Sequence, residues 1–232
     1  MREVVLDTET TGFEPAEGHR IVEIGAVELF NHMPTGRTYH QYINPKRQMP
    51  KEAFEVHGLG DDFLRDKPFF PAIAQAFLDF IADAPLVIHN ASFDMKFLNA
   101  ELTEASFQPL PAGRAVDTLL IARKKFPGSP ASLDALCRRF NIDNSMREKH
   151  GALLDSEILA EVYLELVGGR QPDFGLATQA QNTATDLADT GQGWRPRPRP
   201  VPLMPGLTPD EKAAHTAFVA AMGDAAVWLK RV

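Results

Sequence analysis

The hydrophobic and polar positions of residues 1–170 follow two periods, one typical of strands and one typical of helices. Short apolar runs predict strands at residues 3–7, 20–30, 37–44, 85–89 and 115–117. Apolar residues three and four apart predict helices at residues 71–81, 92–104, 118–126, 132–140 and 152–167. A turn is expected at Pro34–Gly36. Three early strands, followed by strands that alternate with helices, predict an α/β fold with a mixed five-stranded sheet and helices on both faces.

The pattern changes after Gly168, which predicts a domain boundary near residue 170. Residues 171–207 are rich in small and polar side chains and then in Arg-Pro pairs, so we expect a linker, flexible in part and extended in part. Thr208, Pro209 and Glu211 together predict the start of a helix within residues 208–232. One short helix cannot form its own core, so this segment is expected to pack on the main domain or on a partner.

Composition and charge narrow the class of protein. The chain has 232 residues, of which 44% are hydrophobic and 24% charged, as in ordinary globular proteins. The net charge of −7 excludes nucleic-acid binding by bulk positive charge alone. The single cysteine, Cys137, excludes an intramolecular disulfide and favours a reducing compartment. We find no apolar run that predicts a signal peptide or a membrane span, so we expect a cytoplasmic protein.

Four carboxylates occupy positions where apolar residues would be expected. Asp7 ends an apolar run and Glu9 follows two residues later, at the end of a strand where ligands gather in α/β sheets. Asp94 and Asp155 each stand three and four residues before the first apolar positions of a helix, so each shares its buried face. A single such acid usually caps a helix or forms an ion pair, but four that converge would need cations.

The choice of donor atoms points to a particular metal chemistry. Ligand sets made only of oxygen favour Mg²⁺ or Mn²⁺ over zinc. Two such ions about 3.5–4 Å apart clamp a phosphodiester, activating water on one side and stabilising the leaving oxygen on the other. Convergence of the four acids would therefore predict metal-dependent phosphodiester hydrolysis.

Hydrolysis also requires a group that accepts a proton. His150 lies five residues before Asp155, in a Lys-His-Gly segment just ahead of a predicted helix, and histidine titrates near neutral pH. Viewed alone, a loop histidine is more often merely exposed. His89 closes a predicted strand, and we expect it to be structural or to support a neighbouring ligand.

Three segments carry a family resemblance: Asp7-Thr-Glu-Thr-Thr-Gly12, His89-Asn-Ala-Ser-Phe-Asp94 and His150-Gly-Ala-Leu-Leu-Asp155. In this order and with this spacing they resemble the motifs of the DEDDh exonucleases, in the branch that uses a histidine. The resemblance implies a ribonuclease H-like fold and removal of nucleotides from 3′ ends with two divalent cations, Mg²⁺ or Mn²⁺. It implies that Asp7, Glu9, Asp94 and Asp155 are the metal ligands and that His150 is the general base.

Further segments are similar to the proofreading subunits of bacterial DNA polymerase III, and this resemblance covers roughly residues 3–170. They are residues 21–28, 52–58, 132–137 and 141–144. By this resemblance Glu52 and His57 contact the terminal nucleotide, beside Asp7, Glu9 and Asp155. Thr8, Thr10 and Phe93 fall in motifs that line the substrate groove. Helix capping by the threonines and core packing by Phe93 are the alternatives.

The tail, by which we mean residues 171–232, resembles these subunits in two places. Gln171, Phe174 and Leu176 are similar to a short peptide that binds the sliding clamp, with a plain linker as the alternative. Residues 207–229 resemble the part that binds the polymerase (alpha) subunit.

Three functions follow as hypotheses. The first is a proofreading exonuclease that removes mismatched nucleotides from DNA 3′ ends. The second is a free-standing DEDDh nuclease that processes RNA ends or repair intermediates, and it would not need the tail. The third is a non-catalytic scaffold that links clamp and polymerase, and it would not need the intact acids and histidine.

Overall fold

The computed structural model describes residues 1–145, 149–168 and 208–223, which belong to two compact units. In the first unit the chain forms one five-stranded sheet with the strand order β3-β2-β1-β4-β5. The strands are β1 (Arg2–Thr10), β2 (Ile21–Phe30), β3 (Met33–Tyr42), β4 (Leu86–Ile88) and β5 (Ala115–Asp117). The first three pair antiparallel, whereas β4 runs parallel to β1 and β5 parallel to β4. The predicted mixed sheet is confirmed.

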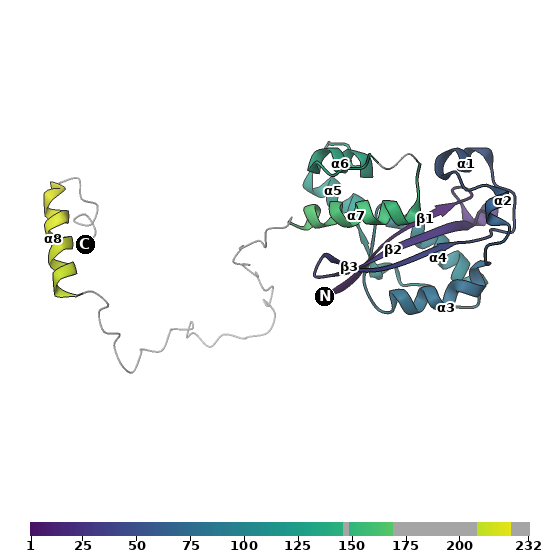
Figure 1. Cartoon of the computed structure of the whole chain (residues 1–232), viewed down its shortest axis with the longest axis horizontal. Coiled ribbons are helices and arrows are strands. Elements are labelled where there is room, and N and C mark those ends of the chain that lie inside the picture. The colour runs from purple at the N-terminus through teal and green to yellow at the C-terminus, as the bar shows by residue number, and fades with distance from the viewer. Residues whose placement is uncertain (146–148, 169–207, 224–232) are drawn as a thin grey trace, which may run out of the picture. The chain divides into compact units, whose positions relative to one another are not determined.

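Seven α-helices of this unit are described (Figure 1). They are α1 (Lys51–His57), α2 (Asp61–Leu64), α3 (Phe70–Ile81), α4 (Ala91–Glu104), α5 (Thr118–Lys125), α6 (Leu133–Phe140) and α7 (Ala152–Val167). Two short 3₁₀ turns lie at Pro15–Glu17 and Ala112–Arg114. The five predicted helices are confirmed, while α1 and α2 were not predicted, because helices of seven and four residues are too short to show a period.

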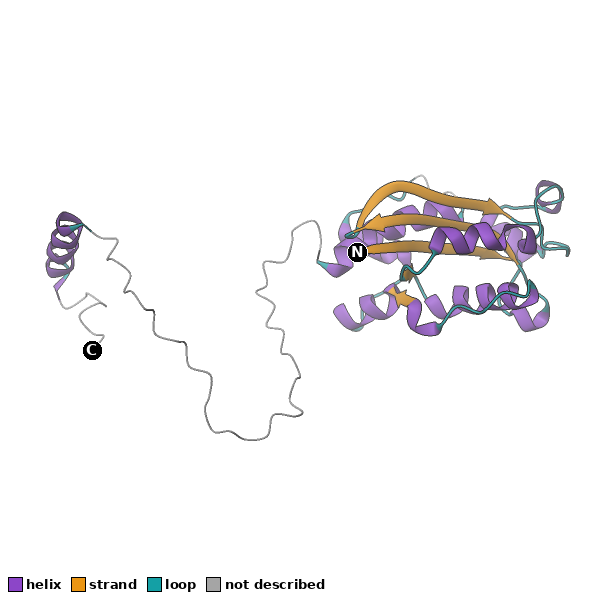
Figure 2. Cartoon of the chain, turned by 90° about the horizontal axis from the view of Figure 1, so that it is seen from below, coloured by secondary structure: helices purple, strands orange, loops and turns teal. Residues whose placement is uncertain are grey.

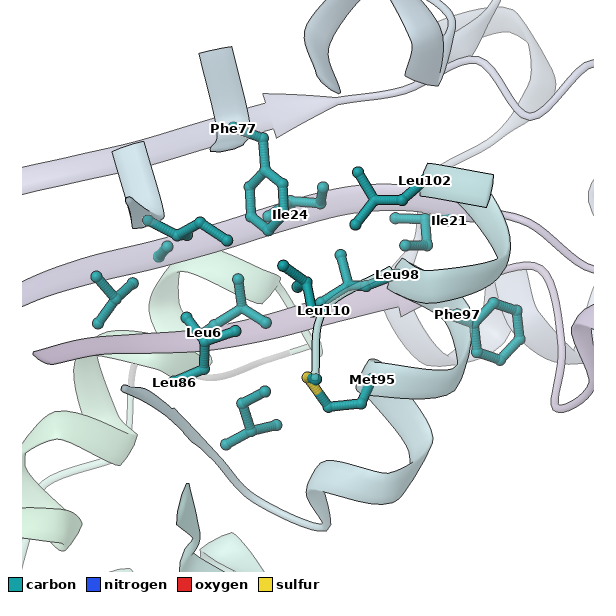
Figure 3. Packing of buried hydrophobic residues seen from close by; sticks show 14 of the residues in the cluster. Leu6, Ile21, Ile24, Phe77, Leu86, Met95, Phe97, Leu98, Leu102 and Leu110 are labelled. Carbon is teal, nitrogen blue, oxygen red and sulfur yellow. The ribbon is translucent and has the colours of Figure 1, made fainter. Parts of the chain in front are cut away.

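Alternation along the strands builds a hydrophobic core on each face of the sheet, and Figure 2 shows helices on both of these faces. In β1, Val4 and Leu6 belong to the cluster beneath α3 and α4, whereas Val5 belongs to the cluster beneath α5, α6 and α7. Figure 3 shows the first cluster, where Leu6 and Leu86 of the sheet lie among side chains such as Phe77 and Leu98. Helices therefore cover both faces, as predicted.

The predicted turn at Pro34–Gly36 is wrong. The turn starts three residues earlier, at Asn31 and His32, whose φ angles of 51° and 64° are left-handed, and Phe30 pairs with Met33 across it. A two-residue hairpin of this hand matches the twist of its strands. Pro34 instead lies within β3, which is an edge strand. An edge strand tolerates proline, because the missing N–H can face away from the neighbouring strand.

The start of α7 lies directly against β2. A Cβ atom at Gly25 would come within 2.1 Å of the Ala152 carbonyl carbon and of the Leu153 nitrogen, so glycine alone permits this approach. The Ser156 hydroxyl donates a hydrogen bond of 2.9 Å to the Gly25 carbonyl. Gly25 pairs with Asp7 on β1, so this packing brings the first turn of α7 to the acidic end of β1.

The second described unit contains α8 (Pro209–Ala221), and its start is the predicted one. Glu211 N–H donates to the Thr208 hydroxyl at 3.3 Å, and Thr208 N–H donates to the Glu211 carboxylate at 2.8 Å. The expected linker at residues 171–207 lies outside the described residues. Within the described part of the chain no helix is both long and apolar enough to cross a bilayer.

Candidate active site

The site is built at the carboxyl end of β1, where the strand carries Asp7, Thr8 and Glu9. Strand β4 runs parallel to β1, so the helix that follows it, α4, begins at the same edge of the sheet. This places Asp94, in the first turn of α4, beside the end of β1. The topology thus joins two segments that lie far apart in the sequence.

The direction of α4 is fixed by a carboxylate on another segment. Asn90 has a left-handed φ of 64°, and Asp117 accepts hydrogen bonds from the backbone N–H groups of Asn90 at 3.3 Å and Ala91 at 3.2 Å. Asp117 is also the N-cap of α5, and its carboxylate accepts a hydrogen bond of 2.9 Å from the Leu119 N–H. One side chain therefore holds the starts of both helices that border the site.

Asp94 is 3% exposed and is held by Thr8. Its Oδ1 accepts from the Thr8 N–H at 3.0 Å and from the Thr8 hydroxyl at 2.7 Å. Burial raises the pKa of Asp94 to about 7, although the hydrogen bonds from Thr8 favour the charged form. Thr8 therefore orients an acid, a role that sequence reasoning did not assign to it.

Asp155 is also 3% exposed and lies in the first turn of α7. The Nδ1 atom of His150, whose side chain is 49% exposed, stands 3.3 Å from Asp155 Oδ2. One donor atom from each of Glu9, His150 and Asp155 lies within 4.8 Å of the others, which suits a metal ion. The predicted acids and histidine are thus brought close together.

A cleft of about 490 Å³ receives all of these side chains. The residues that line it include the predicted set Asp7, Glu9, Asp94, His150 and Asp155. Residues of α5 and α6 also line it, and among the described lining residues Arg123 of α5 is the one lysine or arginine. His89 also lines the cleft. Its Nδ1 shares a hydrogen bond of 2.9 Å with the Thr118 hydroxyl, and burial lowers its pKa.

A second cleft, of about 710 Å³, adjoins the first and shares Thr8, Glu9, Asn90, Phe93 and His150 with it. Glu52 and His57, on α1, line this second cleft together with Thr10. The structure therefore brings the predicted nucleotide-contacting residues to the predicted metal site. The Thr10 hydroxyl also donates a hydrogen bond of 2.6 Å to the Gly12 carbonyl, so Thr10 stabilises the turn after β1.

His57, which lines this second cleft, is only 6% exposed. Its Nδ1 accepts from the Leu59 N–H at 3.0 Å, which places the ring proton on Nε2. Burial lowers the pKa of His57, while the nearby Thr10 carbonyl opposes this shift. Nε2 makes no hydrogen bond of ordinary geometry within the described residues, so a ligand atom could satisfy it.

Sequence reasoning missed three contributors. Asn90 lies inside the motif of residues 89–94, but only its left-handed backbone conformation shows that it sets the direction in which α4 starts. The Asp117-Thr118 pair is a recognisable N-cap pattern and could have been found. Arg123 carries no local signal, because its place at the cleft depends on how α5 packs.

Comparison with known proteins identifies relatives over most of the chain. The exonuclease family model RNase T matches residues 4–163. DNA polymerase III subunit epsilon of Rickettsia felis is 48% identical over 225 residues, which cover 96% of this chain and 97% of the relative. The subunit of the same name from Escherichia coli K12 is 51% identical over 177 residues, covering 73% of this chain and 72% of its own.

A solved structure shares the fold. The nuclease domain of 3′hExo, described as a DEDDh family member bound to rAMP, superimposes with a TM-score of 0.63 at 20% identity. The match covers 72% of this chain and 91% of that domain. The expected ribonuclease H-like exonuclease fold is confirmed.

Proposed function

The chain belongs to the RNase T family of exonucleases, and from this premise we propose that it is a 3′–5′ exonuclease that proofreads for DNA polymerase III. It would remove mismatched nucleotides from DNA 3′ ends. The observation that carries the proposal is the convergence of four acids and one histidine in a single cleft. A non-catalytic scaffold would not require this set, and a free-standing nuclease would not share the whole length of an epsilon subunit.

The donor atoms of the cleft fit divalent cations. Oxygen predominates, and Glu9, His150 and Asp155 already lie within reach of one ion. We assign Asp7, Glu9, Asp94 and Asp155 as the residues that would hold two cations, Mg²⁺ or Mn²⁺. When bound, such ions neutralise the phosphodiester charge and make water more acidic.

His150 is assigned the proton transfer. Its contact with Asp155 favours the tautomer that carries hydrogen on Nδ1, which leaves the Nε2 lone pair to accept a proton from the attacking water. The water oxygen forms a bond to phosphorus, the bond from phosphorus to the 3′ oxygen of the preceding nucleotide breaks, and that oxygen takes up a proton from solvent to become a hydroxyl. The half-exposed position of His150 allows the proton to pass on to solvent.

The two clefts suggest where the substrate lies. Glu52, His57 and Phe93 would contact the terminal nucleoside in the second cleft, which places the scissile phosphate over the acids. The strand would then continue along the wall of the first cleft, where Arg123 can pair with a phosphate.

We propose that the tail binds partner proteins. A net charge of −7 opposes DNA binding, so residence at a primer end would come from a tether that raises the local concentration. We propose that residues 208–232 bind the polymerase (alpha) subunit. We propose that Gln171, Phe174 and Leu176, which lie outside the described residues, bind the sliding clamp. A replicase subunit would work in the cytoplasm.

A strand labelled at its 5′ end tests the reaction. With Mg²⁺, the protein should shorten the strand stepwise from the 3′ end, and excess chelator should stop it. Asp155→Asn should abolish shortening, whereas Glu161→Gln, an exposed carboxylate on the same helix, should leave it unchanged. Shortening that persists in chelator or in Asp155→Asn would refute the assignment.

A further inference from the structure

Two segments far apart in the sequence meet beside the clefts, namely α1 and residues 149–151. The His150 N–H donates to the Val56 carbonyl at 3.2 Å. The Lys149 ammonium lies 5.2 Å from the centre of the Phe54 ring, within cation–π range. The Lys149 side chain also passes so close to Gly58 that a Cβ there would stand 2.9 Å from its Cδ. The segment that carries the assigned base is therefore docked on α1.

We propose that Phe54 and Lys149 are positioning residues, which hold the His150 backbone so that its imidazole faces Asp155. This inference rests on the proposed function, because it concerns the base of that reaction. The His150 side chain is half exposed, so burial does not fix its place. Its orientation must come from contacts, and the contacts to α1 act on the backbone of residues 149 and 150.

Helix α1 also connects this segment to the nucleotide. A seven-residue helix is marginal on its own and takes its stability from what packs on it. Glu52, Val56 and His57 line the second cleft, and Phe54 contacts the docked lysine from the same helix. A nucleoside that fills the second cleft would therefore stabilise α1 and, through it, the position of His150. A 3′ end that fails to enter would meet a less well placed base.

A double-mutant cycle between Phe54→Ala and His150→Gln tests this coupling. The rate is single-turnover removal of one nucleotide from a single strand, with enzyme in saturating excess. A cation–π contact at an exposed site corresponds to about a two- to fivefold change in an equilibrium, so Phe54→Ala should slow the wild type by about that factor. In the His150→Gln background it should have no further effect, because the base it positions is gone.

The cycle separates positioning from a general effect on structure. If Phe54→Ala slows both backgrounds by the same factor, or slows neither, the inference is overturned. Phe54→Tyr keeps the aromatic face and should restore the wild-type rate. If Phe54→Ala does not fold, Lys149→Met removes the cation, keeps the apolar stem, and takes its place in the same cycle. A wild-type protein without nuclease activity would instead count against the proposed function.

The chain offers a matched control in Phe63. It is 45% exposed, close to the 43% of Phe54, and the Lys67 ammonium lies 4.4 Å from its ring centre. Phe63 is not among the described residues that line either cleft, and its ring packs on Tyr42 instead, so Phe63→Ala should keep the wild-type rate. A strand that ends in an abasic 3′ nucleotide completes the test. The wild type should cut it more slowly at saturation, and Phe54→Ala should show a smaller difference between the two strands.

Discussion

Gly25→Ala should damage the active site without touching any group that takes part in the reaction. The added Cβ would stand 2.1 Å from two backbone atoms of α7, where ordinary contact begins at 3.4 Å. Backbone cannot rotate away as a side chain can, so the start of α7 must retreat by roughly 1.3 Å. Asp155 lies in that turn, and His150 precedes it.

The cost has two parts. Overpacking of this kind destabilises by about 1–3 kcal/mol, and loss of the Ser156 hydrogen bond to Gly25 adds about 1 kcal/mol. The sum, about 2–4 kcal/mol, lowers the unfolding midpoint by roughly 5–15 °C in a chain of this size. A displacement of about 1 Å at a reacting group can reduce the rate by about 10²-fold.

Thermal unfolding and single-turnover removal of a 3′ nucleotide measure the two effects on one preparation. Gly113→Ala is the control, because nothing lies within 4 Å of its added Cβ and its backbone is not left-handed. It should match the wild type in both assays. A Gly25→Ala protein with a wild-type midpoint and a rate within a few-fold of wild type would refute the proposed packing of α7 on β2.

Three further predictions concern other parts of the molecule. His150→Gln keeps a polar side chain but cannot accept a proton, so the rate of nucleotide removal should fall by about 10²–10⁴-fold; a rate near wild type would exclude His150 as the base. Burial raises the pKa of Asp94 from 3.8 to about 7, so the folded, metal-free protein should lose stability as the pH rises from about 4 to about 7. Thermal unfolding in chelator should show this loss for the wild type and a smaller loss for Asp94→Asn. Residues 1–170 alone should stay folded and active on short single strands but lose the polymerase subunit; co-elution of that subunit with the fragment would contradict the role assigned to the tail.

The regular parts of the fold were accessible to sequence reasoning because they bury apolar faces. Helix α7 shows this well, since its predicted bounds, residues 152–167, are those observed. The hairpin turn was misplaced because Pro34 and Gly36 are common turn residues, whereas the strand tolerates them at the sheet edge. Helix α1 was missed because most of its side chains are exposed.

The acids of the site were predictable for a different reason. A carboxylate on a buried face violates the usual pattern, and Asp94 and Asp155 were noticed on that ground. The support that Thr8 gives to Asp94 was not predictable, because it joins residues far apart in the sequence. Asp117 is recognisable as the N-cap of α5, but its hydrogen bond to the Ala91 N–H also joins distant segments. The docking of Lys149 on Phe54 is of the same kind, since it joins residues almost a hundred positions apart.

The central claim is that the cleft proofreads DNA 3′ ends. The most direct test is the rate of 3′ nucleotide removal from a primer annealed to a template, with the last base either paired or mispaired. We predict Mg²⁺-dependent removal that is faster from the mispaired end, because a frayed terminus enters the clefts without the cost of melting base pairs. We predict no removal by Asp155→Asn. Equal rates on both ends, or loss of nucleotides from the 5′ end, would contradict it.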